Sequence, residues 1–263
     1  MIIEQIYTDN AYRNFNYLIA CDETGEALAI DPLESRLCLD AAKDKGWEIT
    51  QVLNTHHHRD HTGGNDAVIR ATGAKLLAHA GANEQIPGID VGLGAGDLVK
   101  VGRTVELEVL DTPGHTMSHV CLLAHGHPPS LICGDTLFNA GAGHCRSGGH
   151  PEHLYNTFAE QLARLPDDIL VYPGHDYIAN NLGFTLDREP DNATAQALLG
   201  EAKAQDPHDA MITTLGLEKE INTFFRLHSP TVIARLRDAI ADFPDDPSPK
   251  DVFLGLRTLR NDW

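Results

Sequence analysis

The 263-residue chain carries a formal net charge of −18, with 42% hydrophobic and 22% charged residues. This composition predicts a soluble globular protein with one sizeable core, and the negative charge argues against nucleic acid or an anionic membrane surface as a partner. No segment approaches the roughly 18 consecutive apolar residues that a membrane span needs, and residues 1–5 lack the pattern of a secretory signal. The five cysteines include no C-x-x-C pair, so we expect a reducing, cytoplasmic location.

The first part of the chain alternates short apolar runs with turns. Residues 1–31 are typical of a β-meander, and residues 35–45 have helical spacing that ends at Gly46. A second helix is expected at 65–71. Residues 80–103 are rich in glycine and lack periodicity, so a loop is expected there. Further strands are predicted at 51–55, 74–78, 105–110, 120–124, 130–133 and 169–172.

The second part is predicted to be mainly helical. Pro151 can occupy the first turn of a helix that runs to Leu165 with apolar residues on one face. After about residue 180 the pattern changes to helices. Three of them begin after a capping residue, at Asn192 for 193–204, Ser229 for 230–242 and Ser248 for 249–260.

The predicted strand at 51–55 is followed by a loop that is rich in histidine. Four histidines and one aspartate fall within six positions, in the order His56, His57, His58, Asp60 and His61. Imidazole and carboxylate ligands together suit zinc, iron or manganese. Open α/β sheets place their ligand sites at the carboxyl ends of strands. The loop therefore predicts a metal site.

Three other predicted strands also end in a histidine or an aspartate, namely His115, Asp135 and His175. In a tight loop, His56 and His58 can point to one side and the two following ligands to the other, so that one loop can hold two metals. Each metal needs about four ligands, which leaves vacancies for the residues at the other strand ends. His57 is expected to point away, and the histidines outside this set are expected to be ordinary core or surface residues.

The chain resembles the metallo-β-lactamase superfamily in four motifs: Thr-His-His-His-Arg-Asp-His at 55–61, Thr-Pro-Gly-His-Thr at 112–116, Gly-Asp-Thr-Leu-Phe at 134–138 and Pro-Gly-His at 173–175. It resembles the glyoxalase II (hydroxyacylglutathione hydrolase) family more narrowly at 14–17, 174–184, 189–192, 214–216 and 222–226. The resemblance implies an α/β fold, a four-layer αββα sandwich with a smaller C-terminal helical domain. Residues 1–180 would form the metal-binding catalytic domain and residues 181–263 the helical substrate-binding domain.

The resemblance also implies the metal ligands and the reaction. The first metal would be held by His56, His58 and His115, and the second by Asp60, His61 and His175, with Asp135 as the bridge. Two divalent ions are expected, zinc first, with iron or manganese as alternatives. A metal-bridging hydroxide would hydrolyse S-D-lactoylglutathione to D-lactate and glutathione, the second step of methylglyoxal detoxification. Asp60 and Asp135 would be the catalytic carboxylates because they hold the metals.

One further carboxylate has two interpretations. Asp31 ends a predicted strand. It could hydrogen-bond a metal-binding imidazole or form an ordinary Asp-Pro turn.

The same resemblance predicts the substrate contacts and marks where this chain departs. Tyr177 and Arg260 match a tyrosine and an arginine that contact glutathione in the family. A lysine expected three positions after that arginine is Trp263 here, and His144 and Arg146 replace a basic residue and a tyrosine. Arg146 and Arg260, with Arg257, could form the basic patch that an anionic substrate needs in an acidic chain.

Three alternatives remain open. The chain could hydrolyse other thioesters or lactones on the same fold. It could instead be an iron persulfide dioxygenase of the same superfamily, or a non-catalytic protein that binds a metal. A small-molecule thioester is the expected partner, and the expected assembly is a monomer or a weak homo-oligomer.

Overall fold

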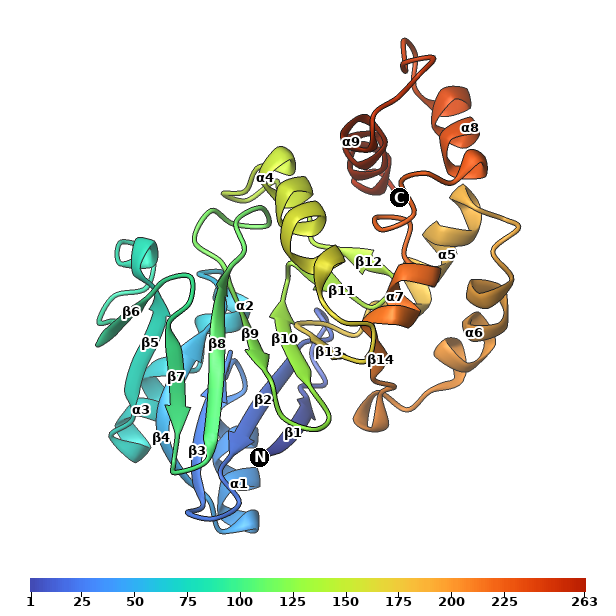
Figure 1. The fold of residues 1–263 in the computed structure, drawn as a ribbon. Coiled ribbons are helices and arrows are strands. Elements are labelled where there is room, and N and C mark those ends of the chain that lie inside the picture. The colour runs from blue at the N-terminus through green and yellow to red at the C-terminus, as the bar shows by residue number, and fades with distance from the viewer. The chain divides into compact units, whose positions relative to one another are not determined.

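The computed structural model describes residues 1–263, which form two compact units (Figure 1). Unit 1 comprises Met1–Thr112, Ser118–Gly134 and Pro173–Asp176. Unit 2 comprises Pro113–Met117, Asp135–Tyr172 and Tyr177–Trp263. The predicted domain boundary at residue 180 stays a prediction.

Unit 1 contains a mixed sheet with the strand order β1-β2-β3-β4-β5-β6. Its first three strands pair antiparallel and the later pairs are parallel. A second, antiparallel sheet has the order β10-β9-β8-β7. The strands are β1 Ile2–Tyr7, β2 Phe15–Ala20, β3 Glu26–Ile30, β4 Glu48–Asn54, β5 Lys75–His79, β6 Val91–Leu93, β7 Leu98–Val101, β8 Val105–Asp111, β9 Val120–Ala124 and β10 Ser130–Gly134.

The first sheet of unit 1 is covered on both faces. Helices α1 (Ser35–Lys45) and α3 (Asn65–Thr72) lie on its outer face (Figure 1) and bury a core of small and branched apolar residues. On the other face the second sheet packs against it through β3 and β7. Every residue of β2 is buried, as expected for a strand with a layer on each side.

The loop after β4 is held close to the end of β3. The short helix α2 (Arg59–Thr62) and two glycines follow the histidines. A Cβ atom on Gly64 would lie 1.8 Å from the carbonyl oxygen of Pro32, so only glycine allows this approach. The sequence thereby brings the histidine loop against Asp31, the last residue before that proline.

Unit 2 is mainly helical, with a β-hairpin formed by β11 and β12 and an antiparallel pair formed by β13 and β14. The strands are β11 Leu137–Phe138, β12 Gly141–Ala142, β13 Leu170–Pro173 and β14 Thr213–Thr214. The helices are α4 Pro151–Asn156, α5 Ile178–Arg188, α6 Ala193–Ala204, α7 Leu215–Ile221, α8 Pro230–Ala239 and α9 Pro249–Arg260.

The predicted helix starts in unit 2 are confirmed. Asn192, Ser229 and Ser248 each accept a hydrogen bond from a backbone amide in the first turn of the following helix. Ser248 also forms a capping box with Asp251. Gly46 ends α1 in the left-handed conformation, as its position predicts.

Two predicted elements are wrong. The stretch 80–103 is not only loop, because it contains β6 and β7. These strands of three and four residues are too short to show a clear periodicity in a glycine-rich stretch. The predicted helix 151–165 stays α-helical only to Asn156 and then continues as a π turn and a 3₁₀ turn. There Thr157 donates to the carbonyl of Pro113 over 2.8 Å, and Phe158 packs among three other phenylalanines. These tertiary contacts are not encoded in local spacing.

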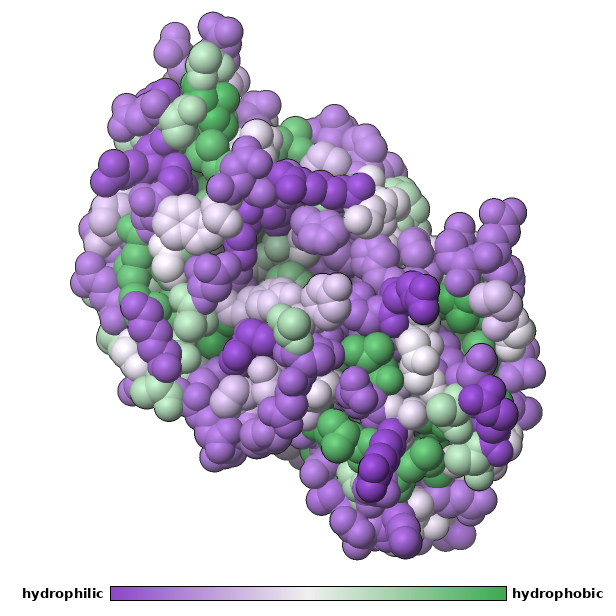
Figure 2. Space-filling model, turned by 180° about the vertical axis from the view of Figure 1, so that it is seen from behind, coloured by the Kyte–Doolittle hydropathy of each residue, from purple (hydrophilic) through white to green (hydrophobic).

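Figure 2 shows a face on which hydrophilic residues dominate and apolar residues form small, scattered groups. This agrees with a chain in which 22% of the residues are charged. None of the helices is long and apolar enough to cross a bilayer.

Candidate functional site

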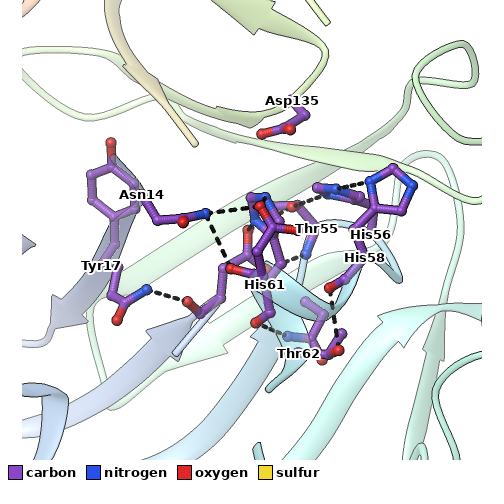
Figure 3. Close-up of polar contacts among 12 residues, drawn as sticks. Asn14, Tyr17, Thr55, His56, His58, His61, Thr62 and Asp135 are labelled. Atoms are coloured by element: carbon purple, nitrogen blue, oxygen red, sulfur yellow. Dashed lines mark hydrogen bonds and ion pairs between the residues drawn. The ribbon is translucent and has the colours of Figure 1, made fainter. Parts of the chain in front are cut away.

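The histidine loop of unit 1 brings imidazole nitrogens unusually close together (Figure 3). Nε2 of His56 lies 3.1 Å from Nδ1 of His58. Nε2 of His61 lies 3.3 Å from Nε2 of His175. Oδ2 of Asp60 is 3.6 Å and 3.5 Å from these two Nε2 atoms. Asp60, His61 and His175 therefore form a compact group of potential ligands.

Asp31 organises the base of this group. Its carboxylate, 3% exposed, accepts hydrogen bonds from the backbone N (2.8 Å) and the hydroxyl (2.6 Å) of Thr55 and lies 2.9 Å from Nδ1 of His61. Since the Thr55 hydroxyl donates to Asp31, it accepts from Nδ1 of His56 at 3.0 Å. Of the two interpretations of Asp31, the structure supports the contact with an imidazole.

The loop between β1 and β2 contacts the other two members of the ligand group, His175 and Asp60. Nδ1 of His175 donates to the backbone carbonyl of Tyr12 over 2.7 Å. The Asn14 amide donates to the carbonyl and to Oδ2 of Asp60 over 3.1 and 3.2 Å. Arg13 forms an ion pair with Asp176, next to His175. These contacts within the protein orient the His175 imidazole and the Asp60 carboxylate.

The nitrogen and oxygen atoms of this ligand group suit a cation. A backbone carbonyl can only accept, so Nδ1 of His175 carries a proton, and the Asp31 carboxylate assigns the same tautomer to His61. In the neutral rings, both Nε2 atoms then direct lone pairs at each other across 3.3 Å, beside the Asp60 carboxylate. Such an arrangement of bases is stabilised by a shared positive ion, and nitrogen with oxygen ligands suits zinc, iron or manganese.

The other two histidines near this loop differ from the candidate ligands. His57 is half-buried, its Nδ1 makes no hydrogen bond, and burial lowers its pKa. It belongs to no group of potential ligands. His119, predicted to be an ordinary residue, is fully buried and stacks on His56 with ring centroids 5.1 Å apart. It therefore contacts a candidate ligand.

Unit 2 places His115 and Asp135 together. Nε2 of His115 lies 3.5 Å from Oδ2 of Asp135. Nδ1 of His115 donates to the backbone carbonyl of His144 over 2.6 Å, so the same tautomer is set here. A Cβ atom on Gly143 would lie 1.9 Å from the Asp135 carbonyl oxygen and 2.8 Å from Nδ1 of His115. The segment around residue 143 is thus pressed against both candidate ligands.

A cavity of about 200 Å³ in unit 2 gathers the predicted substrate residues. Tyr177 packs edge-on against Phe138 in its wall, with ring centroids 5.3 Å apart. The residues lining the cavity are Phe138, Ala142, His144, Arg146, Tyr177, Arg257, Arg260, Asn261 and Trp263.

The cavity is cationic. Arg257, 5% exposed, donates to the carbonyls of Ala142 (2.8 Å) and Gly143 (3.0 Å), and burial lowers its pKa to about 10. Arg260 donates to the side-chain oxygen of Asn181 over 3.0 Å, and burial lowers its pKa as well. Both guanidinium groups bind neutral oxygens in place of carboxylates. Positive charge is thus concentrated at this cavity in an acidic chain.

Comparison with known families identifies two adjoining regions. Residues 19–175 match the model of the metallo-beta-lactamase superfamily, and residues 176–263 match the model described as hydroxyacylglutathione hydrolase C-terminus. A hydroxyacylglutathione hydrolase of Nitrosococcus oceani is 66% identical over 263 residues, which cover 100% of both chains. The chain belongs to the hydroxyacylglutathione hydrolase family. Relatives of the same name from Polaromonas sp. (66% identical, 100% of both chains) and Anaeromyxobacter dehalogenans (40%, 94% of this chain and 95% of that one) agree.

Solved structures support the fold. ETHE1 from Myxococcus xanthus is 26% identical, with a TM-score of 0.68 over 99% of this chain and 98% of that one. The BLEG-1 B3 metallo-beta-lactamase, 21% identical, has a TM-score of 0.65 over 85% of this chain and 99% of that one. The predicted family and the fold class, an αββα sandwich with a C-terminal helical region, are confirmed. The histidine and aspartate groups of this family member are compatible with a binuclear metal site.

Sequence reasoning missed several residues that organise the site. Asn14 and Thr55 lie inside motifs that were used only to recognise the family resemblance. For Thr55, the position directly before His56 was the one indication in the sequence of a role in orienting a ligand. Tyr12 acts through its backbone carbonyl, which no side-chain pattern can reveal. His119 looked like any other histidine of a chain that has 15.

Proposed function

We propose that this family member hydrolyses the thioester bond of S-(2-hydroxyacyl)glutathione, with S-D-lactoylglutathione as the expected substrate. The products are D-lactate and glutathione, as in the second step of methylglyoxal detoxification. The observation that carries the proposal is the convergence of Nε2 of His61, Nε2 of His175 and the Asp60 carboxylate on one point. The cationic cavity and the name of the 66% identical relatives support the same substrate class.

Two divalent metal ions belong to the proposal, zinc first, with iron or manganese as alternatives. The proposed ligands are His56, His58 and His115 for the first ion and Asp60, His61 and His175 for the second, with Asp135 as the bridge. When bound, such ions supply Lewis acidity and lower the pKa of a coordinated water from 15.7 to about 7.

The chain's own residues prepare this chemistry. Asp31 and the carbonyl of Tyr12 hold the protons of His61 and His175 on Nδ1, so that each Nε2 presents its lone pair. Asp60 and Asp135, the proposed catalytic carboxylates, offset part of the positive charge. Hydrolysis joins a water oxygen to the thioester carbon and breaks the carbon–sulfur bond, whose electron pair leaves with the thiolate. A thiol has a pKa of about 8.5, so the thiolate can leave without a strong protein acid. Of the two protons of the attacking water, one ends on the released sulfur and the other passes to solvent, because the product carboxylate is ionised.

The cationic cavity is the proposed site for the glutathione part. Tyr177, Arg260, His144 and Arg146 all line it, together with Arg257. Glutathione carries two carboxylates, which guanidinium groups bind through charge-assisted hydrogen bonds. Trp263 lies in the same wall, where the family resemblance expects a lysine.

Location and assembly complete the proposal. The five cysteines are free, which supports a reducing, cytoplasmic compartment. A monomer or a weak homo-oligomer is the proposed assembly. The family assignment disfavours an iron persulfide dioxygenase and a non-catalytic metal protein.

The test is steady-state hydrolysis by the purified protein, with and without a chelator. S-D-lactoylglutathione is compared with other glutathione thioesters and with acyl-CoA thioesters. We expect chelator-sensitive turnover with the highest kcat/KM for the lactoyl thioester. Absence of turnover would refute the proposed function. A preference for acyl-CoA thioesters would refute the role given to the cationic cavity.

A further inference from the structure

Glu218 is a buried carboxylate in unit 2 that the proposed reaction does not use. It lies on α7 and is 0% exposed. Oε1 accepts from the Thr213 hydroxyl (2.7 Å) and the Asn139 amide (3.4 Å). Oε2 accepts from the backbone N of Ala140 (2.7 Å) and the Asn222 amide (3.2 Å). Four donors thus surround one carboxylate.

This environment suits only an acceptor. An ionised carboxylate accepts at both oxygens, whereas a glutamine would turn one NH₂ group toward two donors. The carboxylate has no cationic partner, and burying such a charge is costly. Burial raises the pKa of Glu218 to about 7, so the ionised form predominates only above neutral pH. The four hydrogen bonds offset part of this cost, and they also hold in place the segments that donate them.

The element they hold is the turn of the β11–β12 hairpin. Asn139 and Ala140 are the two residues between these strands. Ala140 has φ of 56°, a left-handed conformation that costs energy without a glycine, and its N–H points at Glu218. Asn222 adds a hydrogen bond to the carbonyl of Gly141 over 2.9 Å. The α7 helix thus fixes the hairpin from one side.

The hairpin lies between two parts of the candidate site in unit 2. Asp135 lies two positions before it, and His144 lies two positions after it and accepts the hydrogen bond from Nδ1 of His115 through its backbone carbonyl. Phe138 and Ala142, which belong to the hairpin, line the cationic cavity. A shift of the turn therefore moves a wall of the cavity and the acceptor that orients His115.

A second connection runs from the turn to an arginine of the cavity. The Asn139 carbonyl accepts from the Asn181 amide over 2.9 Å, and the Asn181 oxygen accepts from Arg260 over 3.0 Å. Glu218 is thus connected to Arg260 through two asparagines.

We propose that Glu218 is a positioning residue that holds the β11–β12 hairpin so that it orients the His115 imidazole and shapes the cationic cavity. Loss of its carboxylate weakens metal binding and glutathione binding together. Both statements rest on binding sites of the proposed function, His115 for the metal and the cationic cavity for glutathione, but neither depends on turnover.

The test compares Glu218→Gln with Glu220→Gln at pH 8, where Glu218 is ionised. Glu220 lies on the same helix and is exposed, so the control makes the same charge change. Zn²⁺ affinity is measured by competition with a chelator, glutathione affinity by calorimetry, and kcat and KM with the lactoyl thioester. For Glu218→Gln we expect about tenfold weaker binding of one of two Zn²⁺ ions and about tenfold weaker glutathione binding. Glu220→Gln should stay within twofold of the wild type.

A rescue variant separates positioning from general stability. Asn139→Asp combined with Glu218→Gln returns a carboxylate to the network and pairs it with the new amide. We expect it to recover at least half of each loss on a logarithmic scale. Unchanged Zn²⁺ and glutathione affinities in Glu218→Gln would overturn the proposal, and so would a loss that the double variant does not recover.

A further variant covers the case in which Glu218→Gln does not fold. Asn139→Ala removes one donor and leaves the contacts of Thr213 and Ala140 with the carboxylate. It must weaken Zn²⁺ and glutathione binding together, and a normal result for both would overturn the proposal. Because Zn²⁺ and glutathione binding need no turnover, an inactive wild type would refute the proposed function alone.

Discussion

The histidine loop of unit 1 and the cationic cavity of unit 2 are built in different ways. In the loop, four candidate ligands lie within six consecutive positions, and the Asp31 carboxylate and the Thr55 hydroxyl orient the rings of His61 and His56. The cavity wall comes from three separate stretches near residues 138–146, 177 and 257–263. Two of its arginines, Arg257 and Arg260, bind neutral oxygens and are largely buried, whereas Arg146 is exposed and forms an ion pair with Asp262. The comparison suggests that chemistry is encoded locally and that substrate recognition depends on long-range packing.

This difference has measurable consequences. Changes in the loop should reduce metal binding and kcat, because they remove the groups that create the reactive centre. Changes in the cavity should mainly alter KM, because they remove interactions made equally in the ground state and the transition state.

The largest effect is expected for His61→Ala. The substitution removes one member of the group formed with Asp60 and His175 and leaves the Asp31 carboxylate without its imidazole. We expect the loss of one metal ion per chain and a decrease in kcat/KM of about 10³-fold or more, because the reaction depends on the metal. Metal analysis and steady-state kinetics measure both.

The matched control is His57→Ala in the same loop. It should retain both ions and kcat/KM within twofold, because His57 belongs to no ligand group. A metal loss as large as that of His61→Ala would contradict the assignment.

The second effect concerns thiol reactivity. Burial raises the pKa of Cys145, beside the arginines of unit 2, to about 11 and that of Cys38 in unit 1 to about 12. The thiolate reacts, and an exposed thiol has a pKa near 8.5, so Cys145 at pH 8 should be alkylated roughly a hundredfold more slowly than free glutathione. Its rate should rise about tenfold per pH unit up to about pH 11.

Mass spectrometry after iodoacetamide treatment measures this rate site by site. Cys38 is fully buried and should not react in the folded protein at any of these pH values. Rapid labelling of Cys145 at pH 7 would contradict the raised pKa.

Asp31→Asn should have an intermediate effect. The amide keeps the size of the side chain but replaces an acceptor that serves Thr55 and His61 with a group that also donates. Loss of such a partner of a metal-binding histidine typically lowers metal affinity about 10- to 100-fold. Chelator competition measures this affinity. Asp40→Asn, on the exposed face of α1, is the control, and an equal change in both variants would refute the role of Asp31.

The smallest effect is expected for Arg260→Gln in the cavity. The substitution removes the positive charge and the hydrogen bond from the guanidinium group to Asn181. We expect KM to rise about tenfold with kcat within twofold, since a charge-assisted hydrogen bond contributes roughly 1.5–3 kcal/mol. Arg235→Gln, on the exposed side of α8, should change neither constant. A decrease in kcat without a change in KM would show that Arg260 acts on the reactive centre.

Some residues that matter in unit 2 could not be recognised from the chain alone. Glu218 lies in the segment Leu217-Glu218-Lys219-Glu220, which is typical of a solvated helix face. Only the packing of α7 against the hairpin buries it. Arg257 was expected at most as part of a surface patch, yet its side chain is almost fully buried against Ala142 and Gly143.

The sequence by itself determined the fold family and grouped Asp60 and His61 in one loop. It could do so because ligand spacing, strand patterns and helix caps are local properties, readable within a few residues. The tertiary structure alone decided that Asp31, Tyr12 and Asn14 orient this group. It alone also enclosed the cationic cavity, because burial and long-range hydrogen bonds arise only when distant elements pack together.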